Sequence, residues 1–428
     1  MSLASSKTYR YVALVDCNNF YASCERVFNP AWNDRPIGVL SNNDGCIVSR
    51  SNELKAAGIP MGAPYFKYRD QLEALNAVIV SSNYELYGDM SSRVMRTLEN
   101  LAPGIEVYSI DEAWLNLARI QPDKLDSCGH RIVSKTYQHT GIPVSVGIGL
   151  TRVLAKIANR ICKQHKVPGS VFKLVDCETI ECSLADVSVG DIWGVGEGWA
   201  KRLERDGIYS ALDLRNIDAS WIRKAYGVIM QRLVFELQGQ PCLEFEDVEP
   251  KKRIIASRSF GSRVTQLNDL LEATSFHATR AGEKLRKQKS VCSALQVFLK
   301  TGKYNPSESR FHASTIVQFS VPTSDTRRLI QAAQQGIKKI FKQGHRYAKT
   351  GVTLLEISPA SVVQSDFFDS IDSGKSQTLM ETIDQVNEER GKYTLFFASE
   401  GTRKSWAMKR DRKTRAYTTR WSELPTVR

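Results

Sequence analysis

Two kinds of pattern are missing from this sequence of 428 residues, and each absence excludes a class of protein. The nine cysteines are scattered and none stands in a CxxC pair, so neither a disulfide framework nor a zinc site is expected. No run approaches the roughly 18 consecutive apolar residues of a membrane span. We therefore expect no membrane partner, and the scattered cysteines favour reduced thiols in a cytoplasm. The first ten residues are polar, so we expect no secretory signal.

Positive charge is concentrated in the second half of the chain. The formal net charge is +13, yet residues 251–357 alone carry 20 Lys and Arg against six Asp and Glu. Residues 400–428 add nine basic residues against three acidic ones. Basic residues in such a block can simply face solvent. A block with this excess of positive charge more often binds a polyanion, and nucleic acid is the usual one.

Apolar runs and helical periodicities alternate along the first half, and at roughly 100–200 residues per domain the chain should hold two to four domains. Strands are expected at 11–15, 77–80, 105–110, 113–117 and 143–149, and helices at 23–28, 52–57, 84–101, 124–139 and 151–165. We predict an α+β layer with the helices packed on one side of the strands. Residues 183–240 change to short helices with Gly-rich turns.

The basic block predicts a self-contained domain. Its strands are expected at 254–260, 291–300, 314–319 and 351–357, and its helices at 269–288 and 326–341. This order, βαββαβ, is typical of a ferredoxin-like split motif. After Pro359 the chain is rich in Ser and Asp, so we expect a tail with little core of its own.

Three carboxylates stand at the ends of two strand-like runs. Asp16 ends the run 11–15, and Asp111 and Glu112 end the run 105–110. If the two strands are neighbours, the three acidic groups lie close together and repel one another unless a cation sits among them. Such hard oxygen ligands suit Mg²⁺ and a two-metal phosphoryl-transfer site. Taken alone, the same residues also fit two unrelated turns.

Residues around this acidic cluster favour a bound phosphate. Backbone N–H groups between Cys17 and Tyr21 lead into a helix, an arrangement that binds anions, although Phe20 and Tyr21 also fit a core. Lys156 and Lys163 are two helical turns apart and therefore point the same way. Gly194 and Gly196 in "IWGVGEGWAKRLERDGI" resemble a helix–hairpin–helix that contacts a DNA phosphate, but they also fit a plain helical turn.

Several longer motifs give a specific resemblance. "DCNNFYASCE", "VLSNNDGCIVSRSNELKAAGIPMG", "SSNYELYGDMSSRVM", "YSIDEAWLNL" and "SVGIGLTRVLAKIAN" occur in this order within residues 11–163. Together they resemble the Y-family translesion DNA polymerases, and among these the UmuC-type catalytic subunit of bacterial DNA polymerase V. The resemblance continues more loosely to "GHRYAKTGV" and "YTTR", so it covers nearly the whole chain.

The resemblance implies an α+β multidomain fold shaped as a right hand. It places a ferredoxin-like palm at 1–22 and 77–180, small fingers at 23–76 and a helical thumb with a helix–hairpin–helix at 181–245. A βαββαβ little finger follows at 251–357. A C-terminal tail at 358–428 would carry clamp-binding and partner-binding segments.

The resemblance also assigns roles around the active site. Asp16, Asp111 and Glu112, helped by the Cys17 carbonyl, would hold two Mg²⁺ ions. Tyr21 would be the steric gate that excludes a 2′-hydroxyl. The triphosphate would be bound by Phe20 through its N–H and by Ser49, Asn52, Lys55 and Lys163, and the nascent base pair would be roofed by Cys46 and Val48. At two of these positions the chain departs from many relatives, which carry Tyr in place of Asn52 and Arg in place of Lys55; Lys lacks the bidentate fork of Arg.

Contacts with macromolecules are implied in the same way. Primer-template DNA would be contacted by Gly194, Gly196, Lys252, Arg253, Arg258 and Arg263. Gln364, Phe367 and Phe368 would bind a sliding clamp, although Ser365 departs from the aliphatic residue usual there. The further partners implied are dNTP, a UmuD′-like accessory dimer and a RecA filament.

The expected function is error-prone, template-directed translesion DNA synthesis in the SOS response, in a bacterial cytoplasm near the nucleoid. Three alternatives stay open: a stand-alone DinB-type polymerase, a non-catalytic DNA-binding scaffold and a nucleotidyl cyclase. Intact Asp16, Asp111 and Glu112 disfavour the scaffold. The basic domain and the helix–hairpin–helix have no purpose in a cyclase.

Overall fold

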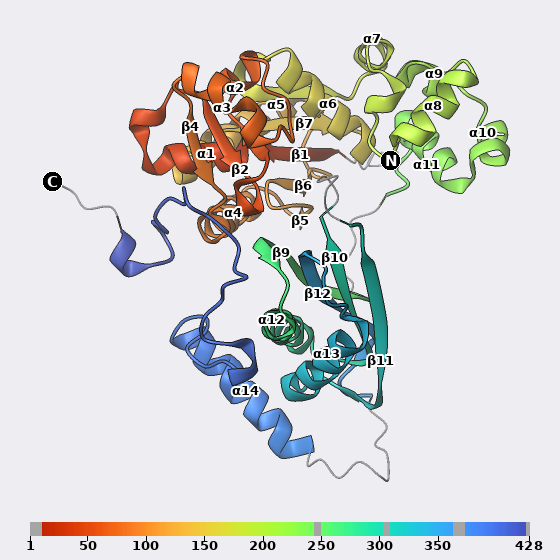
Figure 1. Cartoon of the computed structure of the whole chain (residues 1–428). Helices are drawn as coiled ribbons and strands as arrows, with labels where there is room; N and C mark the ends of the chain where they lie inside the picture. Colours follow the sequence, from red (N-terminus) through yellow and green to blue (C-terminus); the bar gives the residue numbers. More distant parts are fainter. Residues whose placement is uncertain (1–10, 244–249, 303–308, 363–372, 425–428) are drawn as a thin grey trace. The chain divides into compact units, whose positions relative to one another are not determined.

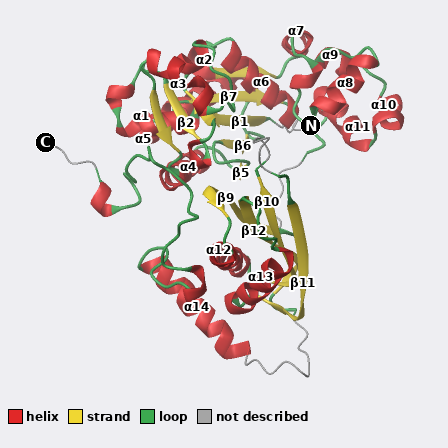
Figure 2. Cartoon of the chain, viewed as in Figure 1, coloured by secondary structure: helices red, strands yellow, loops and turns green. Residues whose placement is uncertain are grey.

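The computed structural model describes residues 11–243, 250–302, 309–362 and 373–424 (Figure 1). The chain forms two compact units: the first comprises 1–41, 45–247 and 412–428, and the second comprises 42–44 and 248–411. Each unit contains both helices and strands (Figure 2). Within the described ranges, no helix is long and apolar enough to cross a membrane.

A five-stranded sheet forms the centre of the first unit. Its strands are β1 (Val12–Cys17), β5 (Ile105–Val107), β6 (Glu112–Asn116), β7 (Val144–Gly149) and β8 (Val171–Leu174), in the order β5-β6-β1-β7-β8. Strand β1 is antiparallel to both β6 and β7, and β8 runs parallel to β7. Successive side chains of β1 therefore point to opposite faces of the sheet.

Helices cover both faces of this sheet. Ala13 and Val15 face a core that includes side chains of α1 (Phe20–Phe28), α4 (Tyr84–Glu99) and α5 (Leu125–Thr140). Leu14 and Trp114 face the other way and pack on Ala155 of α6 (Arg152–Gln164). The prediction that the helices lie on one side of the strands is therefore wrong. Asp16 and Glu112 belong to the face that α6 covers, because each lies two residues from one of these apolar side chains.

Glycine in β7 allows α6 to approach the sheet closely. A Cβ atom on Gly147 would lie 2.2 Å from the backbone nitrogen of Asn159 and 2.3 Å from the carbonyl oxygen of Ala155. The Asn159 amide group donates hydrogen bonds to the carbonyl oxygens of Leu14 and Ser145, at 3.3 and 2.8 Å. Helix α6 is thus fixed to β1 and β7 by close packing at Gly147 and by the hydrogen bonds of the Asn159 side chain.

The acidic pair stands where a turn leads into β6, not at the end of the strand before the turn. The run 105–110 was predicted to be one strand, but β5 ends at Val107 and Glu112 is the first residue of β6. The hydroxyl oxygen of Ser109 accepts hydrogen bonds from the N–H groups of Asp111 and Glu112, at 3.2 and 3.0 Å. A serine that bonds the backbone two or three residues ahead closes a turn, and this interrupts the apolar run.

Two smaller substructures complete the first unit. The small sheet, in the order β3-β2-β4, contains β2 (Ile37–Leu40), β3 (Ile47–Arg50) and β4 (Val78–Ser81), and is accompanied by α2 (Asn52–Ala56) and α3 (Tyr65–Ala74). A helical cluster contains α7 (Cys177–Ala185), α8 (Glu197–Arg205), α9 (Ala211–Arg215), α10 (Ala219–Tyr226) and α11 (Val228–Leu237). Buried Glu236 of α11 accepts a hydrogen bond from the N–H of Val153 in the first turn of α6, which ties the cluster to that helix.

The second unit confirms the predicted βαββαβ order. Its elements are β9 (Ile254–Val264), α12 (Leu267–Lys287), β10 (Ser290–Thr301), β11 (His312–Thr323), α13 (Thr326–Ile340) and β12 (Tyr347–Pro359). The antiparallel sheet has the order β11-β10-β12-β9. Strand β12 lies between β9 and β10, and β10 lies between β11 and β12, which is a split βαβ arrangement.

The segment after Pro359 is more ordered than predicted. It contains α14 (Ser373–Glu389), whose Asp384 binds Arg286 of α12 through two contacts of 2.6 and 2.8 Å. Further along, Trp406 is buried in the core of the second unit. The chain then returns to the first unit as residues 412–424, which we name the C-terminal strap, and there Ala416 is fully buried. The apolar residues of this segment join existing cores, which agrees with the prediction that it has little core of its own, whereas its ordered helix was not expected.

Candidate active site

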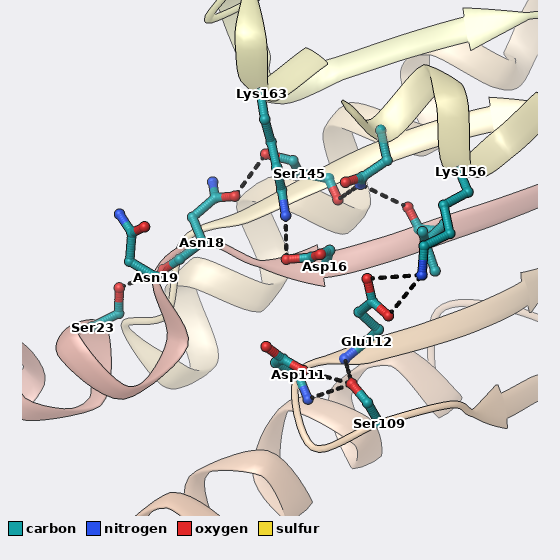
Figure 3. A network of polar contacts seen from close by, with 12 residues as sticks. Asp16, Asn18, Asn19, Ser23, Ser109, Asp111, Glu112, Ser145, Lys156 and Lys163 are labelled. Carbon is teal, nitrogen blue, oxygen red and sulfur yellow. Dashed lines mark hydrogen bonds and ion pairs between the residues drawn. The ribbon is translucent and has the colours of Figure 1, made fainter. Parts of the chain in front are cut away.

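The three predicted carboxylates lie near one another, at the end of β1 and at the start of β6 (Figure 3). Asp16 of β1 lies directly opposite Glu112 of β6 in the strand register. The N–H of Cys17 donates a 2.8 Å hydrogen bond to the carbonyl oxygen of Asp111, which fixes the turn beside the strand end. The expected neighbourhood of the two acidic segments is therefore confirmed.

Two lysines of α6 neutralise two of these carboxylates, Asp16 and Glu112. Lys163 forms an ion pair with Asp16, and the ammonium nitrogen of Lys156 lies 3.1 and 3.3 Å from the two carboxylate oxygens of Glu112 (Figure 3). The seven-residue spacing places both lysines on the face of α6 that covers the sheet. Burial raises the pKa of Asp16 to about 7, an effect that Lys163 opposes and Glu112 reinforces.

The donor atoms suit a divalent cation of the hard type. Asp16, Asp111 and Glu112 offer carboxylate oxygens, which are the ligands that Mg²⁺ prefers. Burial and the charges of Asp16, Asp111 and Glu112 all raise the pKa of the Cys17 thiol, so the acidic groups lie around the end of β1. Among the described residues no three acidic, His or Cys side chains form a ready-made metal cluster, since Asp16 and Glu112 turn to lysines.

Asn19 joins the loop after β1 to α2. It precedes α1 in the left-handed conformation, with φ of 50°, which Asn adopts more readily than most residues. Its amide nitrogen lies 2.9 Å from the side-chain oxygen of Asn52, and its side-chain oxygen accepts a hydrogen bond from Lys55. Asn52 and Lys55 are thus brought beside the loop, and their role in triphosphate binding stays a prediction. Asn19 itself was not singled out from the sequence.

Positive charge gathers beside Asp16. The pKa of Lys55 is lowered by burial and then by the neighbouring charges of Arg50 and Lys163. Three cationic side chains from β3, α2 and α6 are therefore close enough to repel one another. Such a cluster favours a multiply charged anion at this place.

Tyr21 lies in the first turn of α1, next to buried Phe20. Its ring stacks on that of Tyr87, with ring centroids 4.4 Å apart and planes 13° apart. Tyr84 approaches the same ring edge-on, at 6.1 Å. The Tyr21 ring is therefore held in place by two aromatic neighbours from α4.

The other predicted nucleotide contacts lie on the small sheet. Ser49 is buried in β3, while Cys46 and Val48 beside it are half-buried. Cys46 pairs with Pro64 through an isolated β-bridge. The roles of Ser49, Cys46 and Val48 stay predictions.

The predicted helix–hairpin–helix glycines are open to solvent. Gly194 has φ of 97°, in the left-handed region that favours glycine, and Gly196 precedes α8. A Cβ atom on either residue would meet no described atom within 4 Å, so the backbone there is accessible. Trp193, next to Gly194, packs on Trp114 at 5.6 Å, which joins this loop to the central sheet.

Two ion pairs beside the site were not predicted. Arg152 binds Glu106 through two hydrogen bonds of 2.8 and 2.6 Å, and its guanidinium lies 5.5 Å from the Trp114 ring. The sequence predicts only that Lys156 shares a helix face with Lys163. Its contact with Glu112 arises because the strand register places Glu112 opposite Asp16, under the same face of α6. The spacing of Arg152 and Lys156, four residues apart on one face, was the available signal.

The predicted DNA contacts of the second unit are exposed. Lys252 and Arg253 precede β9, and Arg258 and Arg263 lie within it. Gln364, Phe367 and Phe368, the predicted clamp contacts, lie outside the described residues.

Residues 15–160 match the impB/mucB/samB family, and residues 251–367 match the C-terminal domain of the same family. Over 420 residues the chain is 42% identical to Protein UmuC of Salmonella typhimurium, covering 97% of this chain and all of that relative. The chain belongs to this family. The predicted resemblance to the UmuC-type Y-family polymerases is therefore confirmed.

Other members and one solved structure support the same assignment. Protein SamB of Salmonella typhimurium is 40% identical to this UmuC-type chain, with 97% of the chain and 99% of SamB covered. A Y-family DNA polymerase chimera of Dbh and Dpo4 has the same fold, with a TM-score of 0.64 and 20% identity over 82% of this chain and 99% of the chimera. Residues 377–427 match a domain of unknown function (DUF4113).

Proposed function

We propose that this UmuC-type chain catalyses template-directed, error-prone DNA synthesis across damaged bases by two-metal nucleotidyl transfer. The observation that carries the proposal is the meeting of Asp16, Asp111 and Glu112 beneath the lysines of α6. The family of the chain and the Y-family fold support it.

The proposed chemistry distributes roles among residues of the first unit. Asp16, Asp111 and Glu112, with the Cys17 carbonyl, would hold two Mg²⁺ ions. When bound, Mg²⁺ lowers the pKa of the primer 3′-hydroxyl and offsets charge on the triphosphate and pyrophosphate. Lys55 and Lys163, oriented by Asn19 and Asp16, would bind the triphosphate.

The remaining nucleotide contacts are proposed from the resemblance. Tyr21 would stack under the sugar and exclude a 2′-hydroxyl. Ser49 and Asn52 would assist triphosphate binding, and Cys46 and Val48 would roof the base pair. The N–H of Phe20 would contact the triphosphate.

DNA would be held by contacts that do not read sequence. Gly194 and Gly196 offer accessible backbone, and the four basic residues near β9 are exposed. The proposed domains are a palm at 1–22 and 77–180, fingers at 23–76, a thumb at 181–245 and a little finger at 251–357. A UmuD′-like dimer, RecA and a sliding clamp are proposed partners of the complete enzyme in the bacterial cytoplasm near the nucleoid.

Primer extension past a defined lesion tests the proposal. The full chain is assayed with Mg²⁺, dNTP and primer-template DNA, with and without accessory proteins and clamp. The double variant Asp111→Asn, Glu112→Gln should lose extension while it keeps DNA binding, because only the carboxylate charge is removed. The matched control is Asp123→Asn, Glu178→Gln, which changes two carboxylates outside the site. Undiminished extension by the first variant would sink the metal-site proposal.

A further inference from the structure

The C-terminal strap packs on the first unit through specific contacts. The N–H of Arg412 donates to the hydroxyl of Ser81, and the N–H of Ser81 donates to the carbonyl of Arg412, at 3.0 and 3.1 Å. The strap thus runs beside β4, the edge strand of the small sheet. Tyr417 then stacks on Phe28 of α1, with ring centroids 4.9 Å apart and planes 7° apart.

Thr414 lies at the polar centre of this contact. Its hydroxyl donates a 3.1 Å hydrogen bond to Glu25 and accepts one of 3.0 Å from the amide group of Asn83. The same amide donates to the carbonyl oxygens of Thr414 and Arg415, at 3.2 and 3.0 Å. Glu25 and Asn83 are both fully buried, so these bonds replace the water that both side chains lose on folding.

Glu25 connects the strap to the aromatic stack at the active site. The oxygen that accepts from Thr414 also accepts a 2.7 Å hydrogen bond from the hydroxyl of Tyr87. Tyr87 is fully buried, and its ring is the one on which Tyr21 stacks. Four side chains therefore form a continuous path from Thr414 through Glu25 and Tyr87 to Tyr21.

The strap donor matters because Glu25 has few partners. Its second carboxylate oxygen is buried and has no hydrogen-bond partner among the described residues. A buried polar group that loses a donor moves toward another or toward water. A shift of Glu25 withdraws the acceptor that fixes the Tyr87 hydroxyl, and Tyr21 then loses a rigid stacking partner.

We propose that the C-terminal strap is a positioning element for Tyr21, with Thr414 as its positioning residue, so that residues near the C-terminus set sugar discrimination. The inference rests on the proposed function, because it takes Tyr21 as the steric gate. It gives a role to part of the region that matches a domain of unknown function. The Thr414 hydroxyl bonds to Glu25 and Asn83 rather than to Asp16, Asp111 or Glu112, so Thr414 acts through Glu25.

The test compares dNTP with rNTP incorporation by the full chain opposite one template base. Thr414→Val removes the hydroxyl but keeps the shape, and should lower the ratio of kcat/KM for dNTP to that for rNTP about fivefold, the effect of one hydrogen bond. The kcat/KM for dNTP should change little. Thr414→Ser should restore the ratio. Thr419→Val, at an exposed position of the same strap, is the matched control.

A second variant approaches the path from its other end. Tyr87→Phe deletes the hydroxyl that donates to Glu25 and should lower the same ratio. Because both variants interrupt one path, Thr414→Val with Tyr87→Phe should lower the ratio less than the product of the single effects. Should Thr414→Val fail to fold, as judged by its thermal transition, Tyr87→Phe alone carries the test.

Tyr21→Ala distinguishes failure of the inference from failure of the proposed function. If Tyr21→Ala admits ribonucleotides and both path variants keep the parent ratio, the strap has no positioning role and the inference is overturned. The inference is also overturned if the path variants lower kcat/KM equally for dNTP and rNTP. Such a result would mean that the path stabilises the fold and does not position Tyr21. If Tyr21→Ala leaves the ratio unchanged, the gate role in the proposed function is wrong and the inference falls with it.

Discussion

The ammonium nitrogen of Lys156 lies 3.1 Å from a carboxylate oxygen of Glu112 and 4.8 Å from the centre of the Tyr108 ring. The Trp193 ring approaches the same nitrogen, at 5.5 Å. A protein cation therefore neutralises a carboxylate proposed to bind Mg²⁺. Two cations that share one carboxylate repel each other, so the lysine opposes metal binding.

Removing this charge should ease metal binding. We expect Lys156→Met to lower, severalfold, the Mg²⁺ concentration that gives half-maximal nucleotide incorporation, because Glu112 loses a competing cation. The measurement is a Mg²⁺ titration of single-nucleotide incorporation. Lys135→Met, on an exposed part of α5, should leave the midpoint unchanged. A higher or unaltered midpoint in Lys156→Met would show that Lys156 does not compete.

Gly147 should be intolerant of any side chain. A methyl group there would lie 2.2 and 2.3 Å from backbone atoms of α6, which cannot give way as a flexible side chain does. Gly147→Ala must therefore lift α6, which carries Lys156 and Lys163, away from the carboxylates. Overpacking typically costs about 1–3 kcal/mol. We expect a lower unfolding temperature and a loss of primer extension.

Gly104→Ala is the control for this substitution. The nearest atom to a methyl group at Gly104 is the Cβ of Asn116 at 3.5 Å, an ordinary contact. This variant should unfold near the parent temperature and stay active. Equal behaviour of the two variants would mean that close approach of α6 is not what Gly147 provides.

Much of the site follows from local sequence patterns. The acidic residues after the runs 11–15 and 105–110 predicted that Asp16 and Glu112 lie close together, and their register confirms this. The neighbour of β1 is β6, however, and β5 lies on the far side of β6. The seven-residue spacing of Lys156 and Lys163 predicted a shared helix face, and both reach carboxylates. Periodicity is a property of a few residues, which is why it can be read from one sequence.

Other features depend on contacts between distant segments. Nothing near Thr414 indicates that it binds Glu25, because 389 positions separate the two. The side of the sheet that α6 covers was likewise mispredicted, since it depends on Gly147 and on Asn159 meeting strands formed elsewhere in the chain. The turn at Ser109 was hidden by the apolar residues on both sides, which fit a strand as well as a turn.

Glu25 should make stability depend on pH. Burial raises its pKa to about 7, while hydrogen bonds from Tyr87 and Thr414 oppose the rise. Between its ordinary value of 4.5 and about 7, the folded chain keeps a proton that the unfolded chain has released. Stability attributable to Glu25 therefore falls as pH rises through this window and is constant above it, a loss of at most about 3 kcal/mol.

The comparison of the parent with Glu25→Gln isolates this effect. Asp16 also has a raised pKa, but it contributes equally to both proteins and cancels. Urea-unfolding midpoints are measured between pH 4.5 and 8. The midpoint of the variant minus that of the parent should increase as pH rises to about 7. Parallel pH profiles of the two proteins would contradict the assigned ionisation of Glu25.

The exposed arginines near β9 should govern the salt dependence of DNA binding. Each phosphate contact by a basic side chain adds roughly one to the slope of log affinity against log salt. Replacing Arg253 and Arg263 by Gln should therefore reduce the slope by about two and weaken binding equally for different sequences. The measurement is fluorescence anisotropy with primer-template DNA at several salt concentrations.

Lys338→Gln with Lys339→Gln is the matched control, because it removes the same charge from exposed positions at the end of α13. A general effect of net charge would lower both slopes alike, whereas a specific contact near β9 lowers only that of the arginine variant. If the slope of log affinity against log salt is the same in the two double variants, DNA binding depends on overall charge. Arg253 and Arg263 would then not be specific DNA contacts.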